Sequence, residues 1–134
     1  MVMQPLLVID DETLIRLDLI DVLEEGGYAV KDVADGGAGL AEIEIRDDLR
    51  GLITDINLGT DINGWQVARR ARKKFPKLAV VYITGDSASQ WPAEGVPNSM
   101  VLQKPFADAQ ILNAITTLLN QNGDLPNQTE TPQS

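Results

Sequence analysis

Five short apolar segments, rich in β-branched residues, alternate in this chain with longer segments of helical periodicity. The apolar segments cover residues 6–9, 29–33, 51–54, 78–83 and 99–102. Strands that alternate with helices pair in parallel, and right-handed crossovers then place helices on both faces of the sheet. At 134 residues, the chain suits a doubly wound α/β domain with five parallel strands in the order 2-1-3-4-5.

Apolar residues at helical spacing predict helices between these strands. They lie near residues 14–23, 38–45, 65–75 and 109–119. Gly26 and Gly123 are expected just beyond the first and the last of these helices. The segment 85–98 contains Pro92, Gly95 and Pro97, which interrupt helical structure. The fourth helix in chain order, which would lie there, should therefore be short or irregular.

The length of the chain indicates one folded domain, which we place at residues 1–120. Residues 121–134 contain two prolines and no periodic apolar residues. Such a composition cannot bury enough apolar surface to order itself, so we expect this segment to be a flexible polar tail.

The chain carries 20 acidic and 11 basic residues, for a net charge of −9. This balance disfavours nonspecific binding to nucleic acid and to anionic membranes. The apolar runs are too short for a transmembrane helix, and the first residues lack the features of a secretory signal, so we expect a cytoplasmic location. Six of the bases lie within residues 69–77. We interpret them as a solvated helix face and not as a patch for an acidic partner.

The residue types that the sequence lacks exclude several kinds of site. The chain has no cysteine and no histidine. Disulfides, thiolate or imidazole metal sites and serine–histidine catalytic triads are therefore excluded.

Polar residues stand at the ends of four of the expected strands. Asp10 and Asp11 follow the first strand, Asp55 ends the third, Thr84 the fourth and Lys104 the fifth. In sheets of this kind, ligands bind outside the carboxyl ends of the strands, where the strand order reverses. Each residue alone is unremarkable at a strand end. Together they should converge on one crevice.

These residue types suit phosphoryl transfer with a divalent cation. Carboxylate oxygens are hard ligands of the kind that Mg²⁺ prefers, and a cation lowers the repulsion between them. Aspartate is a known type of phosphoryl acceptor. Lys104 can hold an anion, and the hydroxyl of Thr84 can donate to it. Because phosphoryl transfer depends mainly on positioning and charge neutralisation, this set of side chains is sufficient for it.

The motifs that contain these residues resemble those of a known family, the receiver domains of two-component response regulators. The resemblance covers residues 5 to about 120. In chain order the motifs are Val8-Ile9-Asp10-Asp11-Glu12, Thr54-Asp55-Ile56-Asn57-Leu58 with Gly64 downstream, Tyr82-Ile83-Thr84-Gly85, and Lys104-Pro105-Phe106.

The resemblance implies a flavodoxin-like fold and a place in a two-component phosphorelay. It implies that Asp55 accepts a phosphoryl group from a histidine kinase or a phosphotransfer protein. It also implies that Asp11 and Asp55 bind Mg²⁺ directly, together with the backbone carbonyl of Asn57, while Asp10 acts through coordinated water. No enzymatic activity is implied beyond Mg²⁺-dependent self-phosphorylation and autodephosphorylation.

By the same resemblance, Thr84 and Lys104 contact the phosphoryl oxygens, and the Lys104–Pro105 peptide bond is cis. Phosphorylation should move Thr84 inward and reshape residues 85–103 together with the last helix. A downstream protein target would then dock on residues 85–121.

The sequence departs from the family pattern at a few positions. Gly59 stands where receivers commonly have a proline, and the loop around it is one residue longer than usual. Val101 replaces the tyrosine or phenylalanine that is commonly coupled to the threonine. Tyr82 shares a strand face with Thr84, and we interpret it as a core residue.

Two other functions remain open from the residues alone. A small Mg²⁺-dependent phosphohydrolase would use the same Asp–Thr–Lys set. Such enzymes normally carry a cap and a second acid two residues after the nucleophile, where this chain has Asn57. A degenerate receiver would bind its partner constitutively, although the site residues are all present. We favour the phosphorylation-switched receiver.

Overall fold

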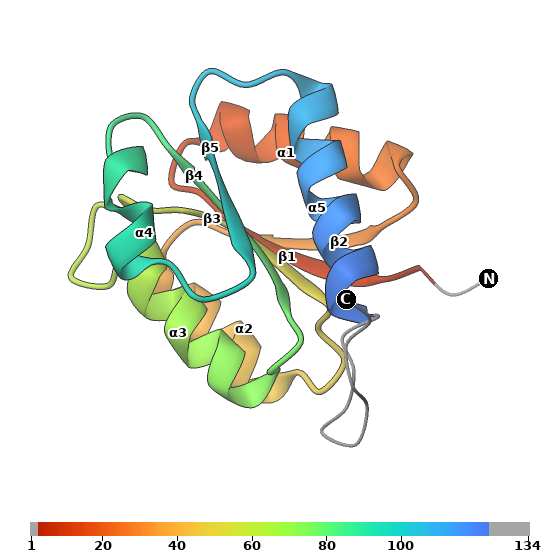
Figure 1. The fold of residues 1–134 in the computed structure, drawn as a ribbon, viewed down its shortest axis with the longest axis horizontal. Coiled ribbons are helices and arrows are strands. Elements are labelled where there is room, and N and C mark those ends of the chain that lie inside the picture. The colour runs from red at the N-terminus through yellow and green to blue at the C-terminus, as the bar shows by residue number, and fades with distance from the viewer. Residues whose placement is uncertain (1–2, 124–134) are drawn as a thin grey trace, which may run out of the picture.

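The computed structural model of this chain describes residues 3–123. Its five strands form one parallel sheet in the order β2-β1-β3-β4-β5, as predicted (Figure 1). The strands are β1 (Pro5–Ile9), β2 (Ala29–Val33), β3 (Gly51–Asp55), β4 (Ala79–Thr84) and β5 (Ser99–Gln103). The α-helices are α1 (Thr13–Glu25), α2 (Gly36–Ile45), α3 (Gly64–Lys74), α4 (Trp91–Glu94) and α5 (Asp108–Gly123).

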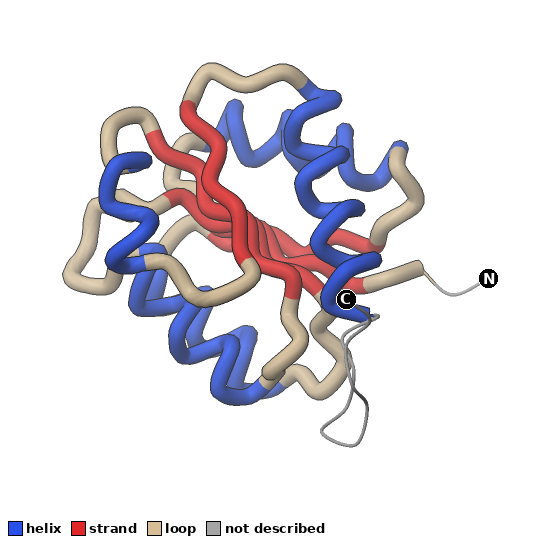
Figure 2. The backbone as a smooth tube through the Cα atoms, viewed as in Figure 1, coloured by secondary structure: helices blue, strands red, loops and turns tan. Residues whose placement is uncertain are grey.

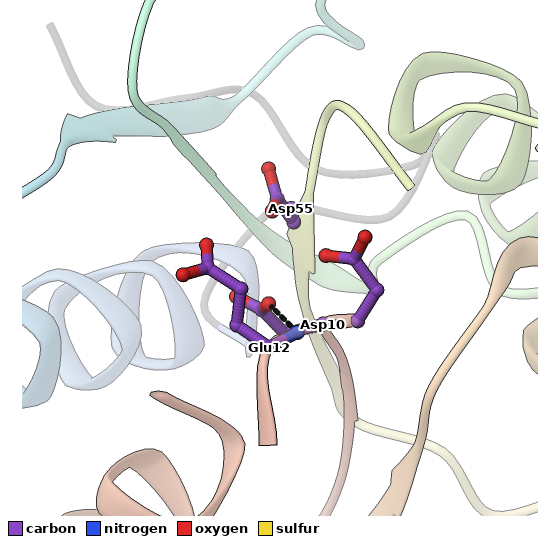
Figure 3. Close-up of side chains that lie close together, drawn as sticks. Asp10, Glu12 and Asp55 are labelled. Carbon is purple, nitrogen blue, oxygen red and sulfur yellow. Dashed lines mark hydrogen bonds between the residues drawn. The ribbon is translucent and has the colours of Figure 1, made fainter. Parts of the chain in front are cut away.

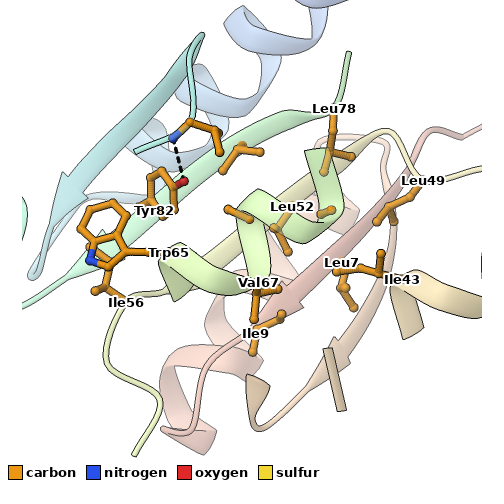
Figure 4. Close-up of a cluster of buried hydrophobic side chains, with 14 of the residues drawn as sticks. Leu7, Ile9, Ile43, Leu49, Leu52, Ile56, Trp65, Val67, Leu78 and Tyr82 are labelled. Carbon is orange, nitrogen blue, oxygen red and sulfur yellow. Dashed lines mark hydrogen bonds between the residues drawn. The ribbon is translucent and has the colours of Figure 1, made fainter. Parts of the chain in front are cut away.

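The helices cover both faces of the sheet, as Figure 2 shows. Successive side chains of a strand point to opposite faces, so each strand contributes to two cores. Leu7 and Leu52 face α2 and α3 in one cluster (Figure 4), whereas Leu6 and Ile53 face α1 and α5 in the other. Because both faces are buried, β3 and β4 are buried along their whole length. The predicted two-sided α/β architecture is therefore confirmed.

The register of the strands brings their carboxyl ends to one edge of the sheet. Ile9 pairs with Thr54, Asp55 with Ile83, and Thr84 with Gln103. Residues that directly follow these positions must therefore lie close together, although they are far apart in sequence.

Side-chain hydrogen bonds cap the N-termini of α2 and α3 but not that of α1. Asp35 caps α2 by accepting a hydrogen bond from the backbone N–H of Ala38. Asn63 and Gln66 form a reciprocal capping box at the start of α3. Glu12 occupies the N-cap position of α1, but its side chain makes no capping hydrogen bond.

The segment between β4 and β5 is irregular, as predicted from its prolines and glycine. It contains a short 3₁₀ helix, Ala88–Gln90, followed by the four residues of α4. The end of α5 was predicted too early, because the helix includes Gly123. The rest of the predicted tail, residues 124–134, lies outside the described residues.

The basic residues of α3 connect it to its neighbours. Arg69 forms an ion pair with Glu94 of α4. Arg72 is half-buried and donates a hydrogen bond to the carbonyl oxygen of Pro97 at 2.6 Å. The C-terminal end of α2 is bound by Arg70 and Lys74. The predicted solvated face is thus exposed in part, but several of its cations are committed to contacts within the chain.

None of the helices within residues 3–123 is long and apolar enough to cross a lipid bilayer.

Candidate functional site

The structure brings most of the predicted site side chains together at one edge of the sheet: Asp10, Asp11, Asp55 and Lys104 lie side by side, and Thr84 ends the strand next to Asp55. Asp10 and Asp11 lie just beyond β1, Asp55 and Thr84 end β3 and β4, and Lys104 follows β5. Asp10 is completely buried and Asp55 is 5% exposed, whereas Asp11 is exposed. The apolar strands fix the backbone positions of Asp10 and Asp55, because each directly follows buried residues of the sheet.

Lys104 lies at the centre of the acidic side chains. Its Nζ is 3.0 Å from Oδ2 of Asp55, 3.3 Å from Oδ2 of Asp10 and 2.8 Å from Oε1 of Glu12. The contacts with Asp55 and Glu12 are hydrogen bonds. One ammonium group therefore contacts three carboxylates, two from the segment between β1 and α1 and one from the end of β3.

The four carboxylates at this edge form a compact cluster. One oxygen from each of Asp10, Asp11, Glu12 and Asp55 lies within 4.8 Å of the others. Figure 3 labels Asp10, Glu12 and Asp55 and shows the hydrogen bond from the backbone N–H of Glu12 to Oδ1 of Asp10, which measures 2.8 Å. Glu12 was not predicted as a site residue. Its place directly after the two aspartates was the signal in the sequence that could have identified it.

This donor set fits a hard divalent cation. Oδ2 of Asp10 is buried and makes no hydrogen bond, since its contact with Lys104 does not meet hydrogen-bond geometry. The cation facing this buried oxygen is Lys104, which it shares with Asp55 and Glu12, so a divalent ion would stabilise it further. Clustered carboxylate oxygens are the ligands that Mg²⁺ prefers.

The electrostatics of the site agree with this reading. Burial raises the pKa of Asp10 and of Asp55 above the ordinary value for aspartate, and backbone and Lys104 contacts offset this only in part. For Lys104, burial lowers the pKa, but hydrogen bonds to Glu12 and Asp55 and the charges of the aspartates raise it by more, so the net shift is upward. The site therefore favours the charged form of Lys104. It also favours either protonation of the aspartates or a bound cation, since each lowers the negative charge of the cluster.

An open cavity of about 400 Å³ lies over Asp55. Its lining residues are Asp11, Glu12, Asp55, Asn57, Gly85, Asp86 and Lys104. Asp55 thus lines a space large enough for a small anion, and the ammonium group of Lys104 lies beside it.

The loop after Thr84 contributes Gly85 and Asp86 to the lining of the cavity, and Thr84 holds this loop from beneath. Thr84 is fully buried, and its hydroxyl oxygen accepts hydrogen bonds from the backbone N–H groups of Asp86, at 3.2 Å, and Ser87, at 2.9 Å. The side chain of Asn57 donates to the carboxylate of Asp86 at 2.9 Å. The loops that follow β3 and β4 are therefore connected across the mouth of the cavity.

Two glycines adapt the loop between β3 and α3 to the site. Gly59 has a φ of 71°, a conformation that proline cannot adopt, which explains why the family's common proline is absent here. A Cβ atom on Gly64 would lie 2.3 Å from the carbonyl oxygen of Asp55. Only glycine allows α3 to begin so close to the end of β3.

Tyr82 is a core residue, as predicted. It is fully buried, its ring lies 4.6 Å from that of Trp65, and its hydroxyl accepts a hydrogen bond from the backbone N–H of Val96 at 3.1 Å (Figure 4). Val101 lies beside it in the sheet register. The Lys104–Pro105 peptide bond is cis, as the family resemblance implied.

Comparison with known proteins agrees with this geometry. The model of the response regulator receiver domain matches residues 6–116. The chain belongs to this family. It is therefore a receiver domain of two-component signalling, a class of domain that is phosphorylated on aspartate, and not a member of a classical enzyme family.

Individual relatives support the same assignment. The receiver is 33% identical to the response regulator receiver protein CpdR of Brucella abortus over 119 residues, which are 87% of this chain and 98% of that protein. It is 30% identical to the transcriptional regulatory protein CusR of Escherichia coli, of which it spans 51%. A crystal structure of a response regulator receiver protein from Sinorhizobium medicae superposes with a TM-score of 0.87 at 37% identity, covering 90% of this chain and 97% of that one.

The phosphohydrolase alternative is not favoured. Asn57 occupies the position where such an enzyme carries its second acid, and its amide donates to Asp86. The N–H groups of an amide are far too weakly acidic to protonate a leaving group at neutral pH.

Proposed function

We propose that this receiver is a phosphorylation-switched binding module in which Asp55 accepts the phosphoryl group. One observation carries the proposal: Asp55 lines the open cavity, and its Oδ2 lies 3.0 Å from the ammonium group of Lys104. A carboxylate oxygen in that position can attack phosphorus while Lys104 balances the charge that develops on the phosphoryl oxygens.

The cation in this proposal is Mg²⁺. Asp11 and Asp55 would hold it directly, with the backbone carbonyl of Asn57, and Asp10 would act mainly through coordinated water. When bound, the ion neutralises charge on the carboxylates and on the incoming phosphoryl group. The Asp10 oxygen that lacks a hydrogen bond supports this assignment.

Thr84 and Lys104 would bind the oxygens of the phosphorylated aspartate. The Thr84 hydroxyl oxygen accepts hydrogen bonds from two backbone N–H groups. Its own O–H can still donate a hydrogen bond to a phosphoryl oxygen. Because those N–H groups belong to Asp86 and Ser87, any movement of the hydroxyl also moves the loop after β4.

The partners follow from this assignment. Receiver domains work with histidine kinases and with downstream effectors, and we propose a histidine kinase or phosphotransfer protein as the donor. A protein target would bind residues 85–121, which include the loop attached to Thr84. With its net charge of −9, the chain would bind neither nucleic acid nor membranes, and would act in the cytoplasm.

The test uses a small phosphodonor and Mg²⁺. Intact-mass spectrometry should detect one added phosphoryl group that is lost on acid treatment. Asp55→Asn should abolish it, because the amide is a poor nucleophile and carries no charge. Asp21→Asn, which removes an exposed acid from α1, should be labelled like the wild type. Persistent labelling of Asp55→Asn would refute the assignment, and multiple turnover of phosphate esters would restore the hydrolase alternative.

A further inference from the structure

Glu12 occupies a helix N-cap without capping the helix. Aspartate, asparagine, serine and threonine at this position usually accept a hydrogen bond from the N–H groups of the first turn, whereas glutamate is not a favoured capping residue. Here the side chain makes no such bond, and its Oε1 lies 2.8 Å from Nζ of Lys104. The side chain is therefore committed to an ion pair with a residue 92 positions later in the chain.

The ammonium group of Lys104 has three donors, and two of them are used. One hydrogen bond goes to Asp55 and one to Glu12. A phosphoryl group on Asp55 adds oxygens that require donors at the same place. For Lys104 to turn fully towards those oxygens, one of its present contacts must open.

Of the three carboxylates around Lys104, Glu12 is the one that can leave. The side chain of Glu12 is 58% exposed, whereas those of Asp10 and Asp55 are 0% and 7% exposed. Glu12 can exchange its ion pair for water at little cost, but the two aspartates are almost completely buried, so loss of their contact with Lys104 would cost more.

Glu12 and Lys104 also stand between two concave surfaces. Both line the cavity over Asp55, and both line a groove of about 430 Å³ between α1 and α5. The pair therefore forms part of the wall that separates the phosphorylation site from that groove.

We propose that Glu12 is a positioning residue that holds Lys104 in a resting position and releases it when a phosphoryl group occupies Asp55. The inference rests on the proposed function of Asp55. It predicts that the resting ion pair opposes phosphoryl binding, so weakening the pair should strengthen binding.

The test compares the affinity of wild type and variants for beryllofluoride, a small phosphoryl mimic, at saturating Mg²⁺. Titration calorimetry would measure it, and backbone amide NMR shifts at Thr84 and Lys104 would confirm the site. Glu12→Gln removes the charge and the pair. Glu12→Asp keeps the charge, but its shorter side chain reaches less far towards Lys104. Aspartate also favours capping of the helix N-terminus, which should weaken the ion pair further. Asp18→Asn removes a nearby exposed charge of α1 and serves as the control.

Both Glu12 variants should bind beryllofluoride about two- to fivefold more tightly than the wild type, the size expected for a solvent-screened ion pair. Asp18→Asn should bind like the wild type. The Mg²⁺ affinity of Glu12→Asp should be unchanged. Matching thermal melts would show that the variants are folded.

Three outcomes overturn the inference. If Glu12→Asp binds like the wild type while Glu12→Gln binds more tightly, only the overall charge matters. If both variants bind Mg²⁺ more weakly, Glu12 serves the cation. If neither variant changes beryllofluoride affinity, the ion pair does not compete. A wild type that binds no beryllofluoride would instead remove the proposed function, and this inference with it.

Discussion

The hydroxyl of Tyr82 anchors the segment between β4 and β5, and removing it should loosen that segment. The hydroxyl oxygen accepts a hydrogen bond from the backbone N–H of Val96 at 3.1 Å, and both residues are buried. Tyr82→Phe deletes only the oxygen atom and leaves the ring in contact with Trp65. The N–H of Val96 then has no acceptor at that position.

The cost can be worked out from this geometry. Leaving a buried donor unsatisfied costs roughly 1–3 kcal/mol, and the phenylalanine recovers a part because no hydroxyl has to be dehydrated. We expect a loss of about 1.5 kcal/mol. For a chain of 134 residues, an unfolding entropy of about 2.1 cal/mol/K per residue converts this loss into a fall in melting temperature of about 5 °C.

Hydrogen exchange distinguishes a local from a global effect. The Val96 amide should exchange about tenfold faster in Tyr82→Phe, because local opening no longer breaks a hydrogen bond. Tyr28→Phe is the matched control, since its hydroxyl contacts Oγ1 of Thr116 at 2.6 Å, on the opposite face of the sheet. It should lower the melting temperature without changing the exchange of Val96 relative to amides of β4. Unchanged Val96 exchange in Tyr82→Phe would refute the anchoring role.

Two further predictions concern the phosphorylation site. Gly64→Ala should destabilise the protein by about 1–3 kcal/mol in urea unfolding, because its Cβ would lie 2.3 Å from the Asp55 carbonyl oxygen, and wild-type stability would contradict this. Without Mg²⁺, Asp10→Asn should stabilise the protein at pH 7, because burial raises the pKa of Asp10 in the folded state. The folded wild type takes up a proton on Asp10 at a higher pH than the unfolded chain, whose Asp10 has a pKa of about 3.9. The wild type therefore gains stability as the pH falls from the folded pKa to the unfolded pKa, and the advantage of the variant should shrink over that range. Unfolding curves whose difference is independent of pH would contradict the raised pKa.

Much of the fold follows from local features of the sequence. The apolar runs marked the strands to within a residue or two, because buried parallel strands leave little room for polar side chains. Pro92, Gly95 and Pro97 predicted the irregular segment correctly. The end of α5 was missed because Gly123 was read as a helix stop, whereas the helix includes it. Terminal helix positions depend on local packing and are poorly specified by residue type.

The functional site, like the fold, could be predicted from the sequence only in part. The sequence by itself determined which chemical groups stand at the strand ends, because a change from apolar to polar residues marks where a buried strand reaches solvent. Only the tertiary structure decided that Glu12 turns away from its own helix towards Lys104, and that Asn57 reaches across to Asp86. The direction of an exposed side chain depends on which partners the folded backbone places within a few ångströms of it. Residues that are far apart in the sequence come within that distance only when the sheet has formed.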